Sequence, residues 1–206
     1  MSASSLIPDL SDVSGRDVSR ETLERLELYQ AMLVEESTRQ NLISASTIGD
    51  FWCRHVLDSA QLLKFVTAEQ SSWADVGSGA GLPGIVIACL AAGPVTLIEP
   101  RRLRADFLHR VVIELSLDAE VLPLKVEGAR GSFDVITARA VANLTELLRI
   151  SAHLSTRNTV WALPKGRNAD AELAEARKSW HGVFHVEHSV TDPDSRIIVA
   201  TGVARK

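Results

Sequence analysis

A glycine-rich segment in the first half of the chain has the residue types and spacing that best indicate chemistry. Residues 73–84 read Trp-Ala-Asp-Val-Gly-Ser-Gly-Ala-Gly-Leu-Pro-Gly, so Gly77, Gly79 and Gly81 stand at every second position. Glycine permits a tight turn and lets the backbone approach a ligand without a Cβ in the way. The segment therefore predicts a ligand-binding loop between a strand and the helix that follows it.

The spacing of these glycines discriminates between cofactors. A dinucleotide fingerprint has the pattern G-x-G-x-x-G, and its third glycine would fall at Leu82. The D-x-G-x-G-x-G pattern that begins at Asp75 instead resembles the loop of class I S-adenosylmethionine methyltransferases. Glu99 lies eighteen residues beyond the last of these glycines, where an acid accepts hydrogen bonds from ribose hydroxyls. The residues expected from these features to bind the cofactor are Asp75, Gly77, Gly79 and Glu99.

The elements around the loop alternate between short β-branched segments and helical patterns. Strands are expected at residues 73–76, 95–98, 120–124, 133–137, 159–163, 183–186 and 196–203. Helices are expected at residues 85–92, 101–115, 144–153 and 169–180. Such alternation predicts an α/β, Rossmann-like fold with a mostly parallel seven-stranded sheet. The last two strands are separated by a connection too short for a helix, so we expect them to pair antiparallel.

The first third of the chain is helical in pattern. After Ser19, a candidate N-cap, apolar residues recur at spacings of three and four: Leu23, Leu26, Tyr29 and Leu33. A second helical stretch is expected at residues 48–65, whereas residues 1–18 show no periodicity and are expected to be a mobile lead-in. We therefore predict an N-terminal helical cap, residues 1–70, and a methyltransferase domain, residues 71–206.

Composition limits the class of protein. The chain has 206 residues, 46% of them hydrophobic and 23% charged, and a mean hydropathy of +0.08, which excludes disorder as the dominant state. The most apolar run, Ile85 to Ile98, is interrupted by Gly93 and Pro94, so no membrane span is expected. Without a visible secretory signal the expected location is the cytoplasm. The two cysteines, Cys53 and Cys89, predict buried thiols and exclude disulfide or zinc frameworks.

The charge of −4 argues against a generally basic nucleic-acid binder, but the acidity is local. Residues 1–50 hold nine acidic and four basic residues, and residues 51–206 hold seventeen and eighteen. A near-neutral body can still present a basic face, and four arginines follow the second strand: Arg101, Arg102, Arg104 and Arg110. They are either RNA phosphate contacts or a solvated helix face.

Several segments together resemble the small-subunit ribosomal RNA methyltransferase G family, also called glucose-inhibited division protein B. They are Asn41-Leu42, Arg54 to Ser59, Asp75 to Gly84, Phe107-Leu108, Val126-Glu127, Phe133 to Ala140 and Lys165-Gly166. The resemblance implies methylation of N7 of guanine 527 in 16S rRNA with S-adenosylmethionine. The expected partner is 16S rRNA or the 30S subunit, and the enzyme is expected to be a monomer without a metal ion.

The resemblance also implies roles for individual residues. Gly77 and Leu82 are expected to contact the cofactor from the loop, Val126 and Glu127 to lie by the adenosine, and Arg139 to reach the reacting end. The basic residues expected to contact the substrate are Arg101, Arg102, Arg104 and Lys165.

The residues present fit the chemistry of N7 methylation. The predicted fourth strand ends in Thr-Ala-Arg-Ala rather than in the Asn/Asp-Pro-Pro-aromatic motif that holds an exocyclic amine, and neither cysteine follows a proline. Guanine N7 carries a lone pair, so it needs no base. Arg139 can bind the cofactor carboxylate, guanine O6 or an RNA phosphate. The methylated base is cationic, so we favour the carboxylate or phosphate over a position against N7; a surface ion pair is the alternative.

Other interpretations remain open from the sequence alone. His55 and Asp58 share a helical face, which indicates either a functional pair or a buried histidine whose hydrogen bonds are satisfied. Two alternatives for the whole chain are a methyltransferase for a small molecule or a protein, and a non-catalytic cofactor-binding factor in ribosome assembly. An assay with tritiated cofactor distinguishes the three functions. An rRNA methyltransferase labels 16S rRNA, another methyltransferase labels a different acceptor, and a binding factor retains the cofactor without transferring the label.

Overall fold

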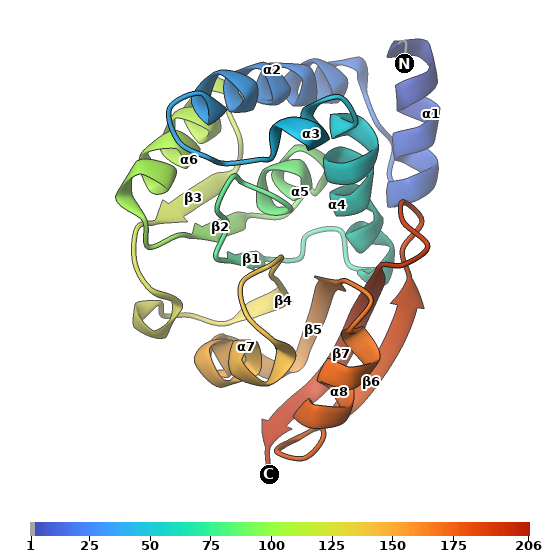
Figure 1. Ribbon diagram of the computed structural model, residues 1–206, viewed down its shortest axis with the longest axis vertical. Helices are drawn as coiled ribbons and strands as arrows, with labels where there is room; N and C mark the ends of the chain where they lie inside the picture. The colour runs from blue at the N-terminus through green and yellow to red at the C-terminus, as the bar shows by residue number, and fades with distance from the viewer. Residues whose placement is uncertain (1–2) are drawn as a thin grey trace.

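The computed structural model describes residues 3–206, in which one mixed sheet is covered by helices on both faces (Figure 1). Within these residues seven strands lie in the order β3-β2-β1-β4-β5-β7-β6, and β7 runs antiparallel to both of its neighbours. The strands are β1 (Trp73–Val76), β2 (Val95–Ile98), β3 (Ala119–Leu122), β4 (Phe133–Thr137), β5 (Ser155–Lys165), β6 (Trp180–His188) and β7 (Arg196–Arg205). The predicted mostly parallel sheet with an antiparallel end is confirmed.

The helices form a layer on each face of the sheet (Figure 1). One layer holds α1 (Ala3–Ser14), α2 (Arg20–Ser37), α3 (Ala45–Ile48), α4 (Asp58–Ala60), α5 (Gly84–Leu90) and α6 (Arg102–Glu114). The other holds α7 (Leu144–Ser151) and α8 (Ala169–Ala176). A π-helical turn, Trp52–Leu57, precedes α4 and a 3-10 turn, Gln61–Phe65, follows it. None of the described helices has the length and apolar character needed to cross a membrane.

The strands show the period of two that burial on both faces requires. On β1, Trp73 packs into the core on the side of the N-terminal helices, whereas Ala74 and Val76 pack into the core beneath α7 and α8. All residues of β1 and β2 are buried, because helices cover both faces of these central strands. Because successive side chains of a strand point to opposite faces of the sheet, Asp75 faces the same helical layer as Trp73.

The helix predicted after Ser19 is confirmed. The side chain of Ser19 caps α2 by accepting a hydrogen bond from Thr22 N at 3.1 Å. The buried face of α2 contains the four apolar residues that carried the prediction, Leu23, Leu26, Tyr29 and Leu33. The second helical stretch, predicted at residues 48–65, is also helical from Trp52 onward, although its winding changes twice.

The prediction of a mobile lead-in at residues 1–18 is wrong for the part that the structure describes. Residues 3–14 form α1, whose Leu6 and Leu10 are buried against the following helices. Pro8 lies within this helix, and Gly15, with a φ of +67°, directly follows its last residue. Met1 and Ser2 lie outside the described residues.

Two smaller differences concern the C-terminal third. The helix predicted at residues 169–180 ends at Ala176, and Trp180 begins β6 instead. The strand β5 begins four residues earlier than predicted, at Ser155. The start of β5 was missed because residues 155–158 are polar and the strand was predicted from the apolar run that follows them.

The N-terminal helices share a core with the sheet. Buried residues of α1 and α2 belong to the same apolar cluster as those of α5, α6 and the first strands. Tyr29 of α2 also donates a hydrogen bond to Ala80 O of the glycine loop at 2.9 Å. The predicted division of the chain near residue 70 stays a prediction, and the helical segment forms one of the layers that support the loop.

Candidate active site

The glycine loop lies at the carboxyl end of β1, where it turns the chain into α5 (Figure 1). Gly77 and Gly79 have φ angles of +68° and +58°, a region in which side chains are strained. A Cβ on Gly77 would also lie 2.6 Å from Val141 Cγ2. The loop therefore needs glycine at both positions, for its path and for the close approach of Val141.

Glu99 follows β2 and points back at the glycine loop. Its Oε2 accepts a hydrogen bond from Gly79 N at 2.9 Å, and its Oε1 accepts one from Arg101 N at 2.8 Å. The side chain is buried, so these two backbone donors compensate for its removal from water. Because each carboxylate oxygen has two acceptor positions, a fixed Glu99 can still accept hydrogen bonds from a ligand.

Asp75 lies beneath the loop on the side of α5. Its Oδ2 accepts a hydrogen bond from Gly84 N at 3.1 Å, and burial raises the pKa of this carboxyl to about 7. Among the described residues, Oδ1 of Asp75 has no hydrogen-bond partner, and neither has Oγ1 of Thr137, the residue paired with it on β4. Asp75 thus supports the loop from below with spare hydrogen-bonding capacity.

A pocket of about 280 Å³, which we call the loop pocket, opens between the glycine loop and the ends of β2 and β4. Its lining includes four residues predicted to bind the cofactor: Gly77, Glu99, Val126 and Glu127. Val126 and Glu127 begin the 3-10 turn Val126–Gly128 that follows β3. The other four predicted residues lie outside this lining: Asp75, Gly79 and Leu82 lie around the loop, and Arg139 lines a neighbouring cavity.

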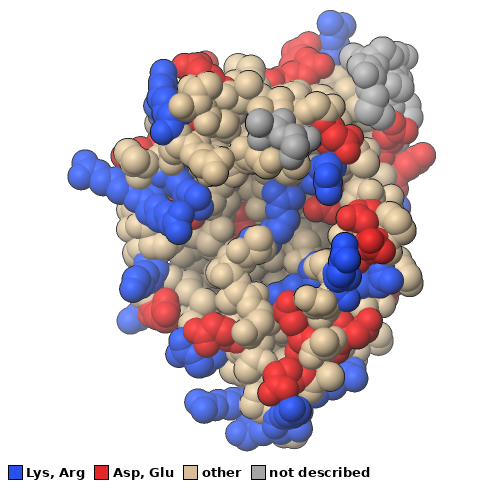
Figure 2. Space-filling view, viewed as in Figure 1, with Lys and Arg blue, Asp and Glu red and all other residues tan. Residues whose placement is uncertain are grey.

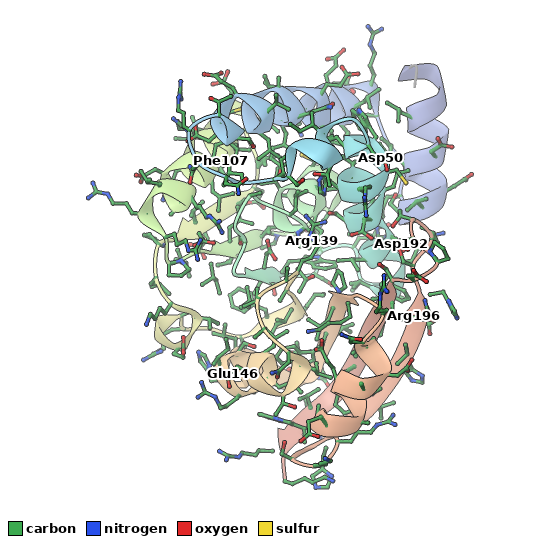
Figure 3. All side chains as sticks on the ribbon, in the orientation of Figure 1. Asp50, Phe107, Arg139, Glu146, Asp192 and Arg196 are labelled. Carbon is green, nitrogen blue, oxygen red and sulfur yellow. The ribbon has the colours of Figure 1, made fainter. Side chains whose placement is uncertain are left out.

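A second cavity, of about 300 Å³, adjoins the loop pocket at Ala140, which lines both. We call it the Arg139 cavity. Figure 3 shows Arg139 near the centre of the molecule in this view, and the residue lies two positions beyond Thr137, the last residue of β4. Its side chain is 23% exposed. The sequence predicted Arg139 at this end of the sheet, and the structure places it beside the loop pocket.

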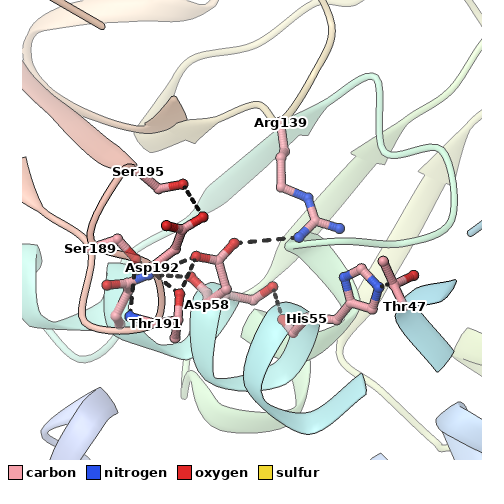
Figure 4. A network of polar contacts seen from close by, with 10 residues as sticks. Thr47, His55, Asp58, Arg139, Ser189, Thr191, Asp192 and Ser195 are labelled. Atoms are coloured by element: carbon pink, nitrogen blue, oxygen red, sulfur yellow. Dashed lines mark hydrogen bonds and ion pairs between the residues drawn. The ribbon is translucent and has the colours of Figure 1, made fainter. Parts of the chain in front are cut away.

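Asp58, from α4, is the carboxylate next to Arg139. Arg139 Nη1 lies 3.4 Å from Asp58 Oδ2, and Figure 4 shows the two side chains pointing toward one another. The other oxygen, Oδ1, accepts hydrogen bonds from Thr191 Oγ1 and Gln61 Nε2, both at 2.9 Å. Thr191 belongs to the loop between β6 and β7. This network therefore joins three regions of the chain that are far apart in sequence.

His55 lies beside this network without contacting Asp58 through its ring. Its Nε2 lies 3.2 Å from Thr47 Oγ1, and its Nδ1 has no partner among the described residues. Burial lowers the pKa of His55 to about 4, and the charge of Arg139 adds to this effect. The imidazole is therefore neutral near pH 7. Of the two sequence interpretations, a satisfied buried histidine is right about burial and wrong about Nδ1, which has no partner among the described residues.

The predicted substrate-binding arginines divide between two places. Arg101 and Arg104 line the loop pocket, whereas Arg102 is exposed and lies 3.9 Å from Asp106 on the outer face of α6. Figure 2 shows Lys and Arg side chains gathered over α6, at the edge of the hollow in the middle of this face. RNA contacts for these residues stay a prediction.

Lys165 lines the Arg139 cavity but is already paired. Its Nζ lies 2.9 Å from Glu172 Oε2 and donates to Ala142 O at 2.9 Å, and only 9% of its side chain is exposed. Glu172 Oε2 also accepts a hydrogen bond from Leu144 N at 2.8 Å. These bonds hold the segment that carries Ala140 between the two cavities. A contact of Lys165 with substrate stays a prediction.

Sequence reasoning found the residues that lie close together along the chain and missed Asp58 as the partner of Arg139. The sequence placed His55 and Asp58 on one helical face but gave no sign of which residue each would meet. In residues 3–206 no three His, Cys, Asp or Glu side chains gather closely enough to hold a metal ion.

Comparison with solved structures shows the fold. The chain matches a ribosomal protein L11 methylase from Lactobacillus delbrueckii subsp. bulgaricus with a TM-score of 0.56 at 16% identity, over 74% of this chain and 79% of that one. It matches M. jannaschii TYW2, solved in complex with AdoMet, with a TM-score of 0.57 at 12% identity, over 82% and 80%. The Rossmann-like methyltransferase fold predicted from the sequence is confirmed.

Sequence comparison shows the family. The chain is 46% identical over 198 residues to the ribosomal RNA small subunit methyltransferase G of Zymomonas mobilis, covering 92% of this chain and 90% of the relative. It is 49% identical over 187 residues to the protein of that name from Sphingopyxis alaskensis, covering 89% and 80%. The family model for rRNA small subunit methyltransferase G matches residues 22–196. The chain belongs to the rRNA small subunit methyltransferase G family.

Proposed function

We propose that this enzyme transfers the methyl group of S-adenosylmethionine to N7 of guanine 527 in 16S rRNA. The observation that carries the proposal is the junction of two cavities: the loop pocket meets the Arg139 cavity at Ala140, in a chain of this family. A cofactor in one cavity and a base in the other would meet at that wall.

The residues of the loop pocket fit S-adenosylmethionine. Glu99 is a buried carboxylate held by two backbone donors, which suits the hydroxyls of a ribose. Val126 supplies apolar surface and Glu127 a carboxylate for the adenosine end. Both the positive φ of Gly77 and its closeness to Val141 require glycine, and because glycine has no Cβ a ligand can approach the backbone here. That the related fold of TYW2 is solved with AdoMet bound supports the same choice.

The chemistry requires positioning rather than proton transfer. When bound, S-adenosylmethionine supplies an electrophilic methyl group; guanine N7 already has the lone pair that forms the new bond. No proton leaves the base, so the chain has only to hold the two reactants in line. Arg139 binds either the cofactor carboxylate or an RNA phosphate.

The substrate class and the state of the enzyme follow from the same proposal. The partner is 16S rRNA, alone or within the 30S subunit, and Arg101, Arg102, Arg104 and Lys165 are the basic residues proposed to lie near it. We further propose that the enzyme acts in the cytoplasm as a monomer without a metal ion.

A transfer assay tests the proposal. The enzyme is incubated with tritiated S-adenosylmethionine and with 16S rRNA or 30S subunits from cells that lack this methyltransferase. We expect one methyl group per rRNA, mapped by chain cleavage at N7-methylguanine to position 527. Label on an exocyclic amine, on a pyrimidine carbon or on protein would contradict the proposal, and so would cofactor binding without transfer.

A further inference from the structure

Asp58 lines the Arg139 cavity, and the proposed function gives it no role. Its side chain is only 17% exposed, yet it faces the cavity beside Arg139 (Figure 4). The two donors to Oδ1, Thr191 and Gln61, come from different elements and fix the orientation of the carboxylate. A buried, oriented carboxylate at a cavity wall is suited to accept a specific hydrogen bond.

The two oxygens of Asp58 differ in the acceptor capacity they have left. A carboxylate oxygen accepts about two hydrogen bonds, and Oδ1 already has two. Among the described residues, the contact of Oδ2 is the one with Arg139 Nη1, and 3.4 Å is long for a charge-assisted bond. Oδ2 therefore keeps capacity for a donor that enters the cavity.

Guanine presents such a donor when its N7 points toward the loop pocket. On the purine ring, N7 and O6 lie along one edge, and N1–H lies beyond O6 on the Watson–Crick edge. With N7 directed at the wall formed by Ala140, N1–H turns away from the loop pocket and into the cavity, whose lining includes Asp58. Enzymes that modify a base commonly extrude it and read this edge.

We infer that Asp58 selects guanine, by accepting the N1–H hydrogen bond of the target base at Oδ2; this inference rests on the proposed function. Adenine carries an unprotonated N1, and its lone pair would face the carboxylate and be repelled. Asp58 and Arg139 together carry no net charge, so Asp58 also offsets the repulsion between Arg139 and a base that becomes cationic on methylation.

The test measures whether the Asp58→Asn enzyme still discriminates between target bases as the wild type does. Single-turnover rates are taken with 16S rRNA that carries guanine, inosine or 2-aminopurine at the target position. Inosine keeps O6 and N1–H, whereas 2-aminopurine lacks both. In the wild type we expect 2-aminopurine to slow transfer at least about 100-fold relative to guanine. In Asp58→Asn the guanine rate falls about 10- to 100-fold, and the ratio between the two bases falls below about tenfold.

Two comparisons separate base selection from the mere positioning of Arg139. The ratio of inosine to guanine should be equal in both enzymes, because inosine keeps the N1–H donor. Thr191→Val removes one donor to Oδ1 and leaves Oδ2 in place, so it should lower the rate on all three bases by a common factor. An Asp58→Asn enzyme that keeps the wild-type penalty for 2-aminopurine within twofold overturns the inference.

A further variant keeps the test decisive if Asp58→Asn does not fold, as judged by its thermal unfolding. Asp58→Glu keeps the charge but displaces the acceptor, and the same collapse of the 2-aminopurine ratio is expected. A wild type that leaves the guanine RNA unmethylated overturns the proposed function and the inference with it. A wild type that methylates guanine, beside variants with unchanged ratios, overturns the inference alone.

Discussion

The loop pocket and the Arg139 cavity share a wall, but the chain builds them in different ways. In the loop pocket, the bond from Gly79 N to Glu99 joins residues twenty positions apart, within one βαβ unit. In the Arg139 cavity, Asp58 meets Arg139 over 81 positions and Thr191 over 133. The contact between Glu99 and the glycine loop is thus encoded locally, whereas the Arg139 cavity depends on the N-terminal and C-terminal thirds meeting.

The largest expected effect comes from breaking the Arg139 cavity alone. Arg139→Ala should lower the single-turnover rate of methyl transfer by several orders of magnitude, because a positioned guanidinium fork is lost. Arg139→Lys should restore the rate only in part, since a lysine keeps the charge without the fork. Neither variant should show the ionisation of an enzyme base near neutral pH, because N7 needs none.

Calorimetry of cofactor binding then distinguishes the two ligands proposed for Arg139. If Arg139 binds an RNA phosphate, Arg139→Ala should keep the wild-type affinity for S-adenosylmethionine; if it binds the cofactor carboxylate, the affinity should fall with the rate. Full activity in Arg139→Ala would contradict the proposed role of this residue in both forms.

Breaking the loop pocket alone should abolish cofactor binding. Gly79→Val places a β-branched side chain at a φ of +58°, and the loop must change its path to relieve this strain. Calorimetry should then detect no binding of S-adenosylmethionine, while circular dichroism shows a folded protein. Gly166→Ala is the matched control, since a Cβ there meets no atom within 4 Å. Unchanged affinity in a folded Gly79→Val protein would overturn the assignment of the loop.

The same contrast explains how much the sequence could predict. Strand alternation and the glycine spacing lie within short windows, so β1, β2 and β4 are found at the predicted residues. The helix α1 was missed because residues 1–18 were judged to have no periodicity, although Leu6 and Leu10 are spaced as on one helical face. Asp58 was noticed, but no local pattern indicates a partner 81 residues away.

Asp75, which lies beneath the glycine loop, should make the stability of the folded protein depend on pH. The pKa of Asp75 is about 7 in the folded chain against an ordinary value of 3.8, so the folded state binds more protons between these values. Stability should therefore fall as pH rises from about 4 to about 7, by up to about 4 kcal/mol at 1.36 kcal/mol per pKa unit. Asp75→Asn removes this loss, so it should be more stable than the wild type at pH 8.

Urea unfolding at pH 5 and pH 8 measures this effect. The free energy of unfolding of Asp75→Asn minus that of the wild type should increase by about 3 kcal/mol from pH 5 to pH 8. The comparison with wild type is needed because His55 changes the stability in the opposite direction. Its pKa of about 4 in the folded chain makes the protein less stable as pH falls below 6.5. Asp134→Asn is the control: hydrogen bonds from Ser72 lower the pKa of Asp134, so the control should keep the wild-type trend. A constant difference for Asp75→Asn would show that Asp75 is already ionised at pH 5.

The smallest expected effect tests whether Glu99 binds the ribose or only holds the loop. Glu99→Ala should weaken S-adenosylmethionine binding by about 1 to 3 kcal/mol, the usual cost of removing a charged acceptor from buried donors. It also frees the backbone N–H groups of Gly79 and Arg101, so a loss of affinity alone does not distinguish the two roles. A cofactor analogue without the ribose hydroxyls does, because its affinity should be nearly equal for wild type and variant if Glu99 binds those hydroxyls. An equal loss for cofactor and analogue would instead assign Glu99 to the loop, and the local encoding of the cofactor site would then rest on the backbone alone.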